Sequence, residues 1–341
     1  MEIPTYTEIA RVAGVSTKTV CNVVGNPAIV RSQTMKRVLE TIHQMGISDV
    51  EMLKARRKPV RADSQRAILL LVDGLSSGAM SSPVYAQMLI AAEQQAHRRG
   101  WQFVLRHRSP GDSLADSLSS FRGQGILLFG RTTSVAEVNH VVQGIRCVRL
   151  LGSSEAKEDC DRVDYDQLEV CRIAVRYLKE RGCQKVGFIG DRINPRGKNF
   201  IHFAGGEALQ VVDGSMEDLF LSDGANQIVN LKVLETAWRK VSKEGIDGLF
   251  LYSDQVANAI YPLLSRQGIR PDQDMKMISC NAEELFLSTL HPRPATIDIH
   301  STELGVRAVE TLRWRIQNPM APPTVIVLGP KLVAGGVPSG N

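Results

Sequence analysis

The segment TYTEIARVAGVSTKTVCNVV, residues 5–24, decides how the rest of this chain is organised. Thr5 and, three residues later, Glu8 form the pattern of a capping box, in which each side chain accepts a hydrogen bond from a backbone N–H at a helix start. A helix is therefore predicted to begin just after Thr5, and Gly14 can adopt the positive φ that ends it. Ser16 suits the N-cap of a second helix. The segment thus predicts two short helices joined by a tight turn.

Each of these two helices has one apolar face and one polar face. The apolar positions are Ile9, Ala10 and Ala13 in the first helix and Val20, Val23 and Val24 in the second. The residues that point elsewhere from the second helix are Thr17, Lys18, Cys21 and Asn22. Such short polar or basic side chains suit a helix that enters a DNA groove. An ordinary helical hairpin with a solvated face fits the same periodicity.

The N-terminal fifth of the chain carries its excess positive charge. A third helix is predicted from Ser32 to Met45, ended by Gly46. The net charge of +5 lies within residues 1–66, and the remainder of the chain is neutral. This asymmetry suits a nucleic-acid-binding headpiece of residues 1–48 on a neutral body. Residues 49–66 form a basic linker, which is either a short helix that folds against DNA or a solvated tether.

Beyond the linker, short apolar strands alternate with helical stretches. The predicted strands are Ala67–Val72, Gln102–Arg106, Gly125–Phe129, Cys147–Leu151, Lys185–Gly190, Leu219–Ser222, Gly248–Leu251 and Lys276–Cys280. The alternation predicts an α/β fold with doubly wound parallel sheets in two lobes and a ligand cleft near the carboxyl ends of the strands. We expect residues 67–165 with 295–322 in the N-terminal lobe and residues 166–294 with 323–341 in the C-terminal lobe.

Several function classes find no support in the 341 residues. No apolar run reaches the ~18 to 20 residues of a membrane span, and no signal sequence is present, so we expect a cytoplasmic protein without a membrane partner. Six scattered cysteines without a C-x-x-C pair, and seven histidines without ligand spacing, indicate neither a metal site nor a disulfide framework. Because nucleotide-binding glycine motifs are absent and carboxylates occur singly, we expect neither an enzyme nor a bound cofactor.

The N-terminal run T-x-x-E-I-A-x-x-A-G-V-S-x-x-T-V, followed by N-P, I-V, R-V-L and a glycine, resembles the headpiece of the lactose-repressor (LacI/GalR) family of bacterial transcription regulators. The resemblance continues through Ser82–Tyr85, Asp166–Leu178, Lys185–Gly190, Ser253–Ala257 and Pro294–Leu312. It implies a homodimeric DNA-binding regulator, in particular a repressor, whose body resembles periplasmic sugar-binding proteins. The implied partners are double-stranded DNA with a pseudo-palindromic operator and a small-molecule effector bound between the lobes.

The resemblance also implies which headpiece residues contact DNA. The residues placed at base edges are Thr17, Lys18 and Asn22, and those placed at phosphates are Thr5, Ser16, Thr19 and Asn26. Lysine can donate to guanine, and asparagine can pair bidentately with adenine. The family often has arginine where this chain has Asn22, so we expect a different half-site, with adenine facing Asn22. The alternative is that one or more of these three side chains contacts only the DNA backbone.

The linker departs from the family's G-Y-x-P-N-x-x-A-R-x-L hinge. The hinge Tyr, Pro, Asn and final Leu are replaced here by Ile47, Asp49, Val50 and Arg56. In the family that Leu is a wedge that kinks the operator. Two alternatives follow for the minor groove: Leu53 or Met52 acts as the wedge, or Arg56 enters a narrow groove without a sharp kink.

The effector cleft departs from the family as well. Ile201, followed by His202, stands where the family has a sugar-gripping Arg, and Asn281 replaces the Asp of its F-D-[DN] motif. The other candidate effector residues, or neighbours of the cleft mouth, are Asp73, Tyr85, Arg131, Arg192, Asn194, Arg196 and Asp254. The loss of two sugar-gripping charges argues against a simple hexose. Three alternatives remain for the cleft. Its arginines bind an anionic ligand, or they are solvated surface residues, or the pocket binds no effector at all.

A rival interpretation belongs to another class: a cytosolic small-molecule-binding protein or enzyme whose helical head mediates protein contacts. Salt dependence separates the two, because a protein that neutralises DNA phosphates releases counterions and binds more weakly as salt rises.

Overall fold

The computed structural model of the protein describes residues 4–25, 30–46, 66–75, 80–108, 112–130, 135–142, 144–152, 159–223 and 226–336. The chain divides into two units, residues 1–65 and residues 66–341, and each is described by itself. Within the described ranges, the helices are all too short or too polar to span a bilayer.

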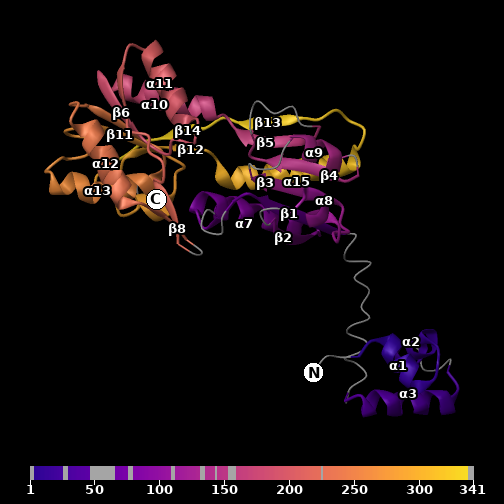
Figure 1. Cartoon of the computed structure of the whole chain (residues 1–341). Helices are drawn as coiled ribbons and strands as arrows, with labels where there is room; N and C mark the ends of the chain where they lie inside the picture. Colours follow the sequence, from indigo (N-terminus) through magenta and orange to yellow (C-terminus); the bar gives the residue numbers. More distant parts are fainter. Residues whose placement is uncertain are drawn as a thin grey trace. The chain divides into compact units, whose positions relative to one another are not determined.

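The described part of the N-terminal unit is helical (Figure 1), with helices α1 (Tyr6–Ala13), α2 (Thr17–Gly25) and α3 (Ser32–Gln44). Thr5 and Glu8 form the predicted capping box: Thr5 N lies 2.6 Å from Glu8 Oε2, and Glu8 N donates to Thr5 Oγ1 at 3.3 Å. Gly14 ends α1 in the left-handed region, at φ 62° and ψ 40°. Thr19 N donates to Ser16 Oγ at 3.1 Å at the start of α2. The predicted helix starts and the turn are confirmed.

One small apolar core holds the helices of this unit together. Its buried members are Ile9, Ala10, Ala13, Val20, Val23, Val24, Val38 and Ile42. Met35, Leu39 and Met45 are partly buried against it, as the helical spacing of α3 predicts. Because the apolar faces of α1 and α2 are buried in this core, the polar face of α2 is accessible to solvent or to a partner.

The N-terminal lobe of the second unit is built on one parallel sheet. Its strands are β1 (Ala67–Asp73), β2 (Gln102–Arg108), β3 (Gly125–Gly130), β4 (Arg146–Leu150), β5 (Asp161–Tyr165) and β13 (Val325–Leu328), in the order β13-β5-β4-β3-β1-β2. Helices α7 (Pro83–Arg98) and α15 (Ser301–Gln317) cover one face, and α8 (Leu114–Leu118) and α9 (Val135–Val142) cover the other (Figure 1). Every residue of β1 and β3 is buried because both faces are covered.

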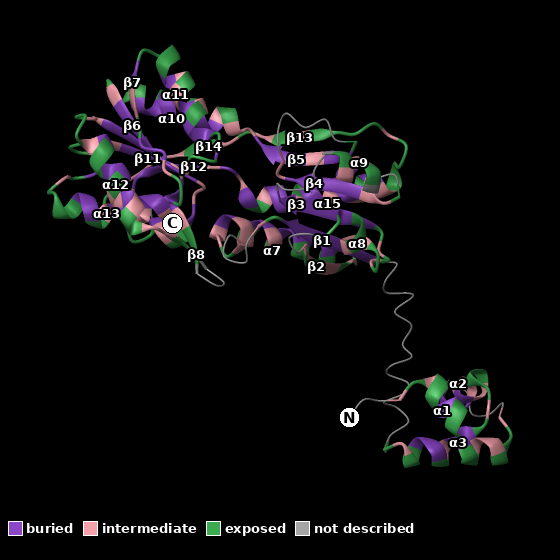
Figure 2. Ribbon diagram, viewed as in Figure 1, coloured by how far each residue is buried: buried purple, intermediate pink, exposed green. Residues whose placement is uncertain are grey.

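The C-terminal lobe contains a second sheet. Its strands are β6 (Lys185–Ile189), β7 (Gln210–Asp213), β10 (Gly248–Leu251), β11 (Lys276–Cys280), β12 (Ala295–Asp298) and β14 (Lys331–Val333), in the order β14-β12-β11-β10-β6-β7. Only the β12–β14 pairing of this sheet is antiparallel. Its helices are α10 (Gln167–Glu180), α11 (Arg196–Gly206), α12 (Leu231–Ser242), α13 (Asp254–Arg266) and α14 (Glu284–Leu287). In Figure 2 the central strands of both lobes are buried.

Two strands lie in a different lobe from the one expected. We expected residues 295–322 in the N-terminal lobe and residues 323–341 in the C-terminal lobe. Instead β12 pairs with β11 of the C-terminal sheet, and β13 pairs with β5 of the N-terminal sheet. The chain therefore passes between the lobes after β5, after β12 and again after β13.

A buried ion pair explains the position of β13. Arg315 of α15 holds Asp161 of β5 through two contacts, Nε to Oδ2 at 2.6 Å and Nη2 to Oδ1 at 2.8 Å. Thr324 N also donates to Asp161 Oδ1 at 2.8 Å, and Arg162 N donates to Thr324 O at 2.9 Å. The segment that enters β13 is thereby fixed beside β5.

One predicted strand has a different role. Leu219–Ser222 was expected in the parallel sheet of the C-terminal lobe. The structure places β8 (Phe220–Asp223) in an antiparallel hairpin with β9 (Asn226–Val229), separate from both large sheets. The other predicted strands match described strands of the two large sheets to within two residues.

Candidate functional site

The polar face of α2 is the first candidate site. Thr17 and Lys18 are exposed, and Asn22 is half-buried one turn after Lys18. Positions 18 and 22 lie on the same face of a helix because they are four residues apart. Val20 and Val24 are fully buried on the other side. The three predicted base readers are thus presented on a face that the headpiece core leaves uncovered.

The predicted phosphate contacts form part of the helix caps. The hydroxyl of Thr5 bonds to Glu8, and the hydroxyls of Ser16 and Thr19 lie 2.9 Å apart. These bonds fix the hydroxyl groups beside the starts of α1 and α2, where backbone N–H groups favour anions. The other predicted DNA and cleft residues Asn26, Leu53, Arg56 and Arg131 lie outside the described residues.

In the N-terminal lobe, Asp73 and Tyr85 lie near the carboxyl ends of the strands. Asp73 is the last residue of β1, is buried, and has Arg108 Nε 3.6 Å from its Oδ1. Tyr85, in the first turn of α7, packs edge-on against Phe129 of β3 with ring centroids 5.1 Å apart. This edge of the sheet is the usual ligand-binding edge in doubly wound folds.

In the C-terminal lobe, Asp254 and Asn281 belong to one hydrogen-bonded group. Asp254 is fully buried and accepts hydrogen bonds from Ser279 Oγ, from Thr296 Oγ1 at 2.7 Å and from the backbone N of Glu283 at 2.7 Å. Asn281 Nδ2 donates to Glu283 Oε2 at 3.1 Å. Burial raises the pKa of Asp254 to about 6, although its hydrogen bonds oppose the shift. Through these bonds Asp254 holds the loop of residues 281–283 in place.

The remaining cleft candidates do not join this group. Arg192 has an exposed side chain whose Nη1 lies 3.7 Å from Glu217 Oε1. His202 is exposed on α11, with its ring 5.4 Å from that of Phe203, and Ile201 beside it is half-buried. The contacts of Arg192 and His202 suit surface solvation better than ligand binding.

Arg196 is the most buried of the arginines near this region. Its guanidinium donates to Tyr252 O and, at 3.0 Å, to Tyr165 OH. Asn194 supports this group, because its Oδ1 accepts from Arg196 N at 2.9 Å and its Nδ2 donates to Tyr252 OH at 3.1 Å. Since Tyr165 ends β5 and Arg196 begins α11, the guanidinium joins the two lobes.

Glu283 was not predicted, and it makes a second contact between the lobes. Its Oε1 accepts a hydrogen bond from the backbone N of Val84 in α7 at 3.2 Å. Burial, and then the charge of Asp254, raise the pKa of Glu283 to about 7. The pair Glu283 and Glu284, between a strand and a short helix, gives no signal in the sequence, because the partner of Glu283 lies 199 residues away.

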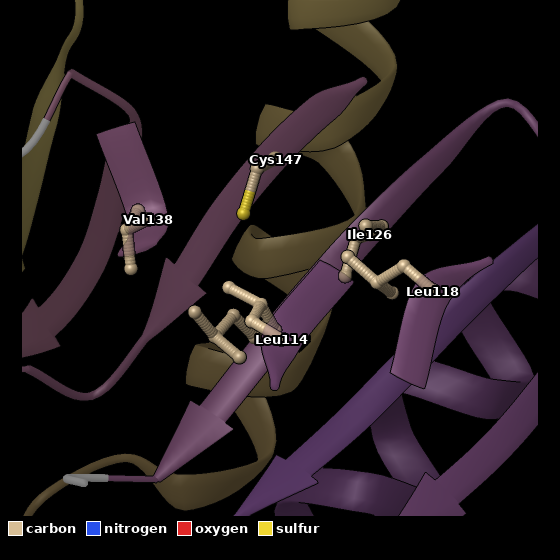
Figure 3. Close-up of a pocket in the computed structure, with 6 residues that line it drawn as sticks. Leu114, Leu118, Ile126, Val138 and Cys147 are labelled. Carbon is tan, nitrogen blue, oxygen red and sulfur yellow. The ribbon is translucent and has the colours of Figure 1, made fainter. Parts of the chain in front are cut away.

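Among the described residues, two further hollows lie elsewhere in the body. Figure 3 shows a seam between the N-terminal sheet and helices α8 and α9, lined by Leu114, Leu118, Ile126, Leu128, Val138 and Cys147. It is wholly apolar and too narrow for a water-sized molecule, so it is a packing defect and not a ligand site. A shallow groove lies between α10 and β14, with carboxylates and basic groups mixed along it.

Comparisons with known proteins agree with this architecture. The family model "Bacterial regulatory proteins, lacI family" matches residues 5–47, and "Periplasmic binding protein-like domain" matches residues 175–336. The HTH-type transcriptional repressor PurR of Actinobacillus pleuropneumoniae serotype 3 (strain JL03) is 23% identical over 96% of both chains. The HTH-type transcriptional regulator GalR of Streptococcus thermophilus is 22% identical over 96% of this chain and 97% of its own.

Solved structures show the same fold along almost the whole chain. The CelR transcriptional regulator in its cellobiose complex has a TM-score of 0.65 at 19% identity, and covers 98% of this chain and 99% of its own. The lac repressor dimer bound to operator and the anti-inducer ONPF has the same TM-score and coverage at 16% identity. With its headpiece matched by the lacI model and residues 175–336 of its body matched by the periplasmic-binding model, the chain belongs to the LacI/GalR family of helix-turn-helix transcriptional regulators.

Proposed function

We propose that the protein is a sequence-specific transcriptional repressor that binds a pseudo-palindromic operator as a homodimer. The observation that carries this proposal is the uncovered face of α2, where Thr17, Lys18 and Asn22 lie opposite the buried valines. A two-fold dimer would present two such helices to successive major grooves. The operator-bound lac repressor dimer supports this assembly by its likeness to the chain.

The test is selection of bound duplexes from a random pool, followed by affinity measurements on the selected site over a range of salt concentrations. We expect binding that weakens steeply with salt, since the excess positive charge of the chain lies in residues 1–66. Salt-insensitive or absent binding would support the rival, a small-molecule-binding protein or enzyme with a protein-interaction head.

Lys18→Ala tests base reading, and Lys36→Ala is its matched control. Both lysines are exposed, but Lys36 lies on α3. Lys18→Ala is expected to cost about 1 to 3 kcal/mol and to relax the preference at one base pair, whereas Lys36→Ala leaves the preferred sequence unchanged. Equal preferences in Lys18→Ala and the unaltered protein would remove Lys18 from the set of base readers.

The DNA-backbone and linker assignments follow from the same proposal. Thr5, Ser16, Thr19 and Asn26 contact phosphates, and Leu53 or Arg56 enters the minor groove at the operator centre. A sharp central kink in the bound operator would favour the Leu53 wedge, and a straight operator would favour Arg56. Circular-permutation gel shifts of the selected operator measure this bend.

The effector is a small molecule held between the lobes. The candidates on the N-terminal side are Asp73, Tyr85 and Arg131, and on the C-terminal side Asn281. Relatives crystallised with cellobiose and with ribose support a sugar. An anionic effector is favoured by Arg196, a buried cation with neutral hydrogen-bond partners and, in the part of the chain the structure describes, no ion pair.

A thermal-shift screen of sugars, nucleobases and anionic metabolites separates these effector classes, and an Arg196→Lys variant identifies dependence on the guanidinium. A true effector must also change operator affinity, and operator must change effector affinity by the same factor. A ligand that raises the melting temperature but leaves operator affinity unchanged is not the regulator.

A further inference from the structure

We propose that Glu283 is a latch between the lobes: it caps helix α7 of the N-terminal lobe from the C-terminal lobe, and its release opens the body. Any effect of this opening on operator binding rests on the function proposed above. The opening itself is a property of the body and can be measured without DNA.

Helix α7 has no cap of its own for its first free N–H group. Its N-cap residue, Ser82, makes no side-chain capping bond, and Pro83 at the first helical position has no N–H. The N–H groups of Tyr85 and Ala86 bond back to Ser82 O, each at 3.0 Å. Val84 N remains, and it donates to Glu283 Oε1. A carboxylate is well suited to this position, because a helix N-terminus carries partial positive charge.

The carboxylate is held rigidly by its own lobe. Glu283 is 2% exposed, its Oε2 accepts from Asn281, and its backbone N donates to Asp254. The two preceding residues have positive φ values, 107° for Asn281 and 57° for Ala282. Such backbone conformations persist only where surrounding contacts enforce them. Asp254 is therefore a positioning residue, which fixes the loop that aims Glu283 at α7.

A second contact from the C-terminal lobe meets α7 at the same place. Gln227 N, in β9, donates to Ser81 Oγ at 3.1 Å, just before the helix begins. Gln227 is itself tied to α13, since Gln255 Nε2 donates to Gln227 O at 2.8 Å. Both contacts act on residues 81–84, so separation of the lobes would uncap α7 at its first turn.

The latch responds to protonation. The charged or titratable groups that face Glu283 and Asp254 are Arg196 of α11, Cys280 of β11 and Arg293 before β12, and α7 contributes its N-terminal N–H. Glu283 has a raised pKa while latched, and an exposed glutamate has its ordinary, lower pKa. The latched form therefore binds more protons, so lowering the pH from 8 to 6 favours it.

Hydrogen exchange of the full-length protein, read by mass spectrometry on a peptide that begins at Ser81 and therefore reports the amide of Val84, tests the latch. Glu283→Ala removes the acceptor, and we expect at least tenfold faster exchange in the first turn of α7. Glu283→Gln keeps Oε1 as an acceptor without the charge, and we expect protection to be retained. Glu284→Ala is the matched control, because the adjacent Glu284 is exposed and pairs only with Arg293 among the described residues.

Unchanged exchange in Glu283→Ala would overturn the proposal, as would equal acceleration in Glu284→Ala. If Glu283→Ala fails to fold, the pH dependence decides. After correction for intrinsic exchange rates, the unaltered protein should be better protected at pH 6 than at pH 8, and Glu283→Gln should be equally protected at both. Matching pH dependence in the two proteins would contradict the latch. None of these readouts requires DNA binding, so they remain valid if the proposed function fails.

Discussion

At the scale of single residues, Asn22 gives the sharpest test of how this headpiece selects its operator. It is half-buried on the face of α2 that also carries the exposed Lys18. An asparagine that pairs bidentately with adenine discriminates at one base pair, whereas one that contacts phosphate weakens all sites alike. For Asn22→Ala we expect a loss of roughly 1 to 3 kcal/mol at a single position of the selected site. A uniform loss across all single-base variants of the operator would show that Asn22 only contacts the backbone.

Gly305 shows how a missing side chain determines the packing of α15 against α7. A Cβ at this position would lie 2.1 Å from Met88 O, closer than any real contact. Gly305→Ala therefore forces the helices apart, and we expect a loss of about 1 to 3 kcal/mol in the free energy of unfolding. Gly206→Ala is the control, since no atom lies within 4 Å of its Cβ position. Urea unfolding of both variants measures the difference, and equal midpoints would contradict this view of the helix contact.

At the scale of secondary-structure elements, the ion pair of Arg315 and Asp161 connects α15, β5 and the start of β13. Both side chains are almost completely buried. Removal of one partner leaves an uncompensated buried charge, so Arg315→Ala should destabilise the body by about 3 to 5 kcal/mol. Arg307→Ala breaks an exposed pair with Glu303 on the same helix and should cost less than about 1 kcal/mol. Denaturant unfolding measures the loss in the free energy of unfolding for each variant. Similar losses would mean that burial does not increase the energetic cost of breaking the Arg315 ion pair.

The elements that sequence reasoning recovers are those with a local signal. The capping box of α1 and the apolar runs of β1 and β3 contain the reason for their structure within a few residues. β5, with the sequence DRVDY, has charged residues at three of five positions, and its burial depends on Arg315, 154 residues away. β13 is an edge strand whose pairing partner cannot be read from its own sequence.

The residues of the candidate sites also divide into those that a local sequence pattern predicts and those that depend on distant partners. The exposed face of α2 follows from local periodicity, and the structure presents Thr17 and Lys18 as expected. No local sequence pattern predicts the role of Glu283, because that role depends on helix α7 of the other lobe, which begins with a proline. Effector binding by Asp254 stays a prediction, and the sequence did not show that three hydrogen-bond donors from separate segments fix its carboxylate.

At the scale of the whole molecule, buried carboxylates make stability depend on pH in an unusual direction. The pKa values of Asp254 and Glu283 are raised to about 6 and about 7, so the folded protein binds protons that the unfolded chain releases near neutral pH. Their contribution is fully present below the ordinary carboxyl pKa values and is lost as the pH rises through 6 and 7. We expect the free energy of unfolding to fall by roughly 1 kcal/mol between pH 6 and pH 8.

Denaturant unfolding at these two pH values measures the effect, and Glu283→Gln is the control. The variant has no carboxyl group at this position to ionise, so its stability should change less with pH. A stability that rises from pH 6 to pH 8 in the unaltered protein would contradict the assignment of raised pKa values to this pair.

The three passages of the chain between the lobes also constrain how the protein is made. β13 completes the edge of the N-terminal sheet, and β14 completes the edge of the C-terminal sheet, although both strands lie within residues 325–333. During synthesis, neither sheet can therefore reach its final set of strands until nearly the whole body has left the ribosome. Domains generally fold as units as they emerge, but here both lobes must wait for the same short segment. The nascent body would thus present two unfinished sheet edges until synthesis is almost complete, a period in which assistance by chaperones would matter most.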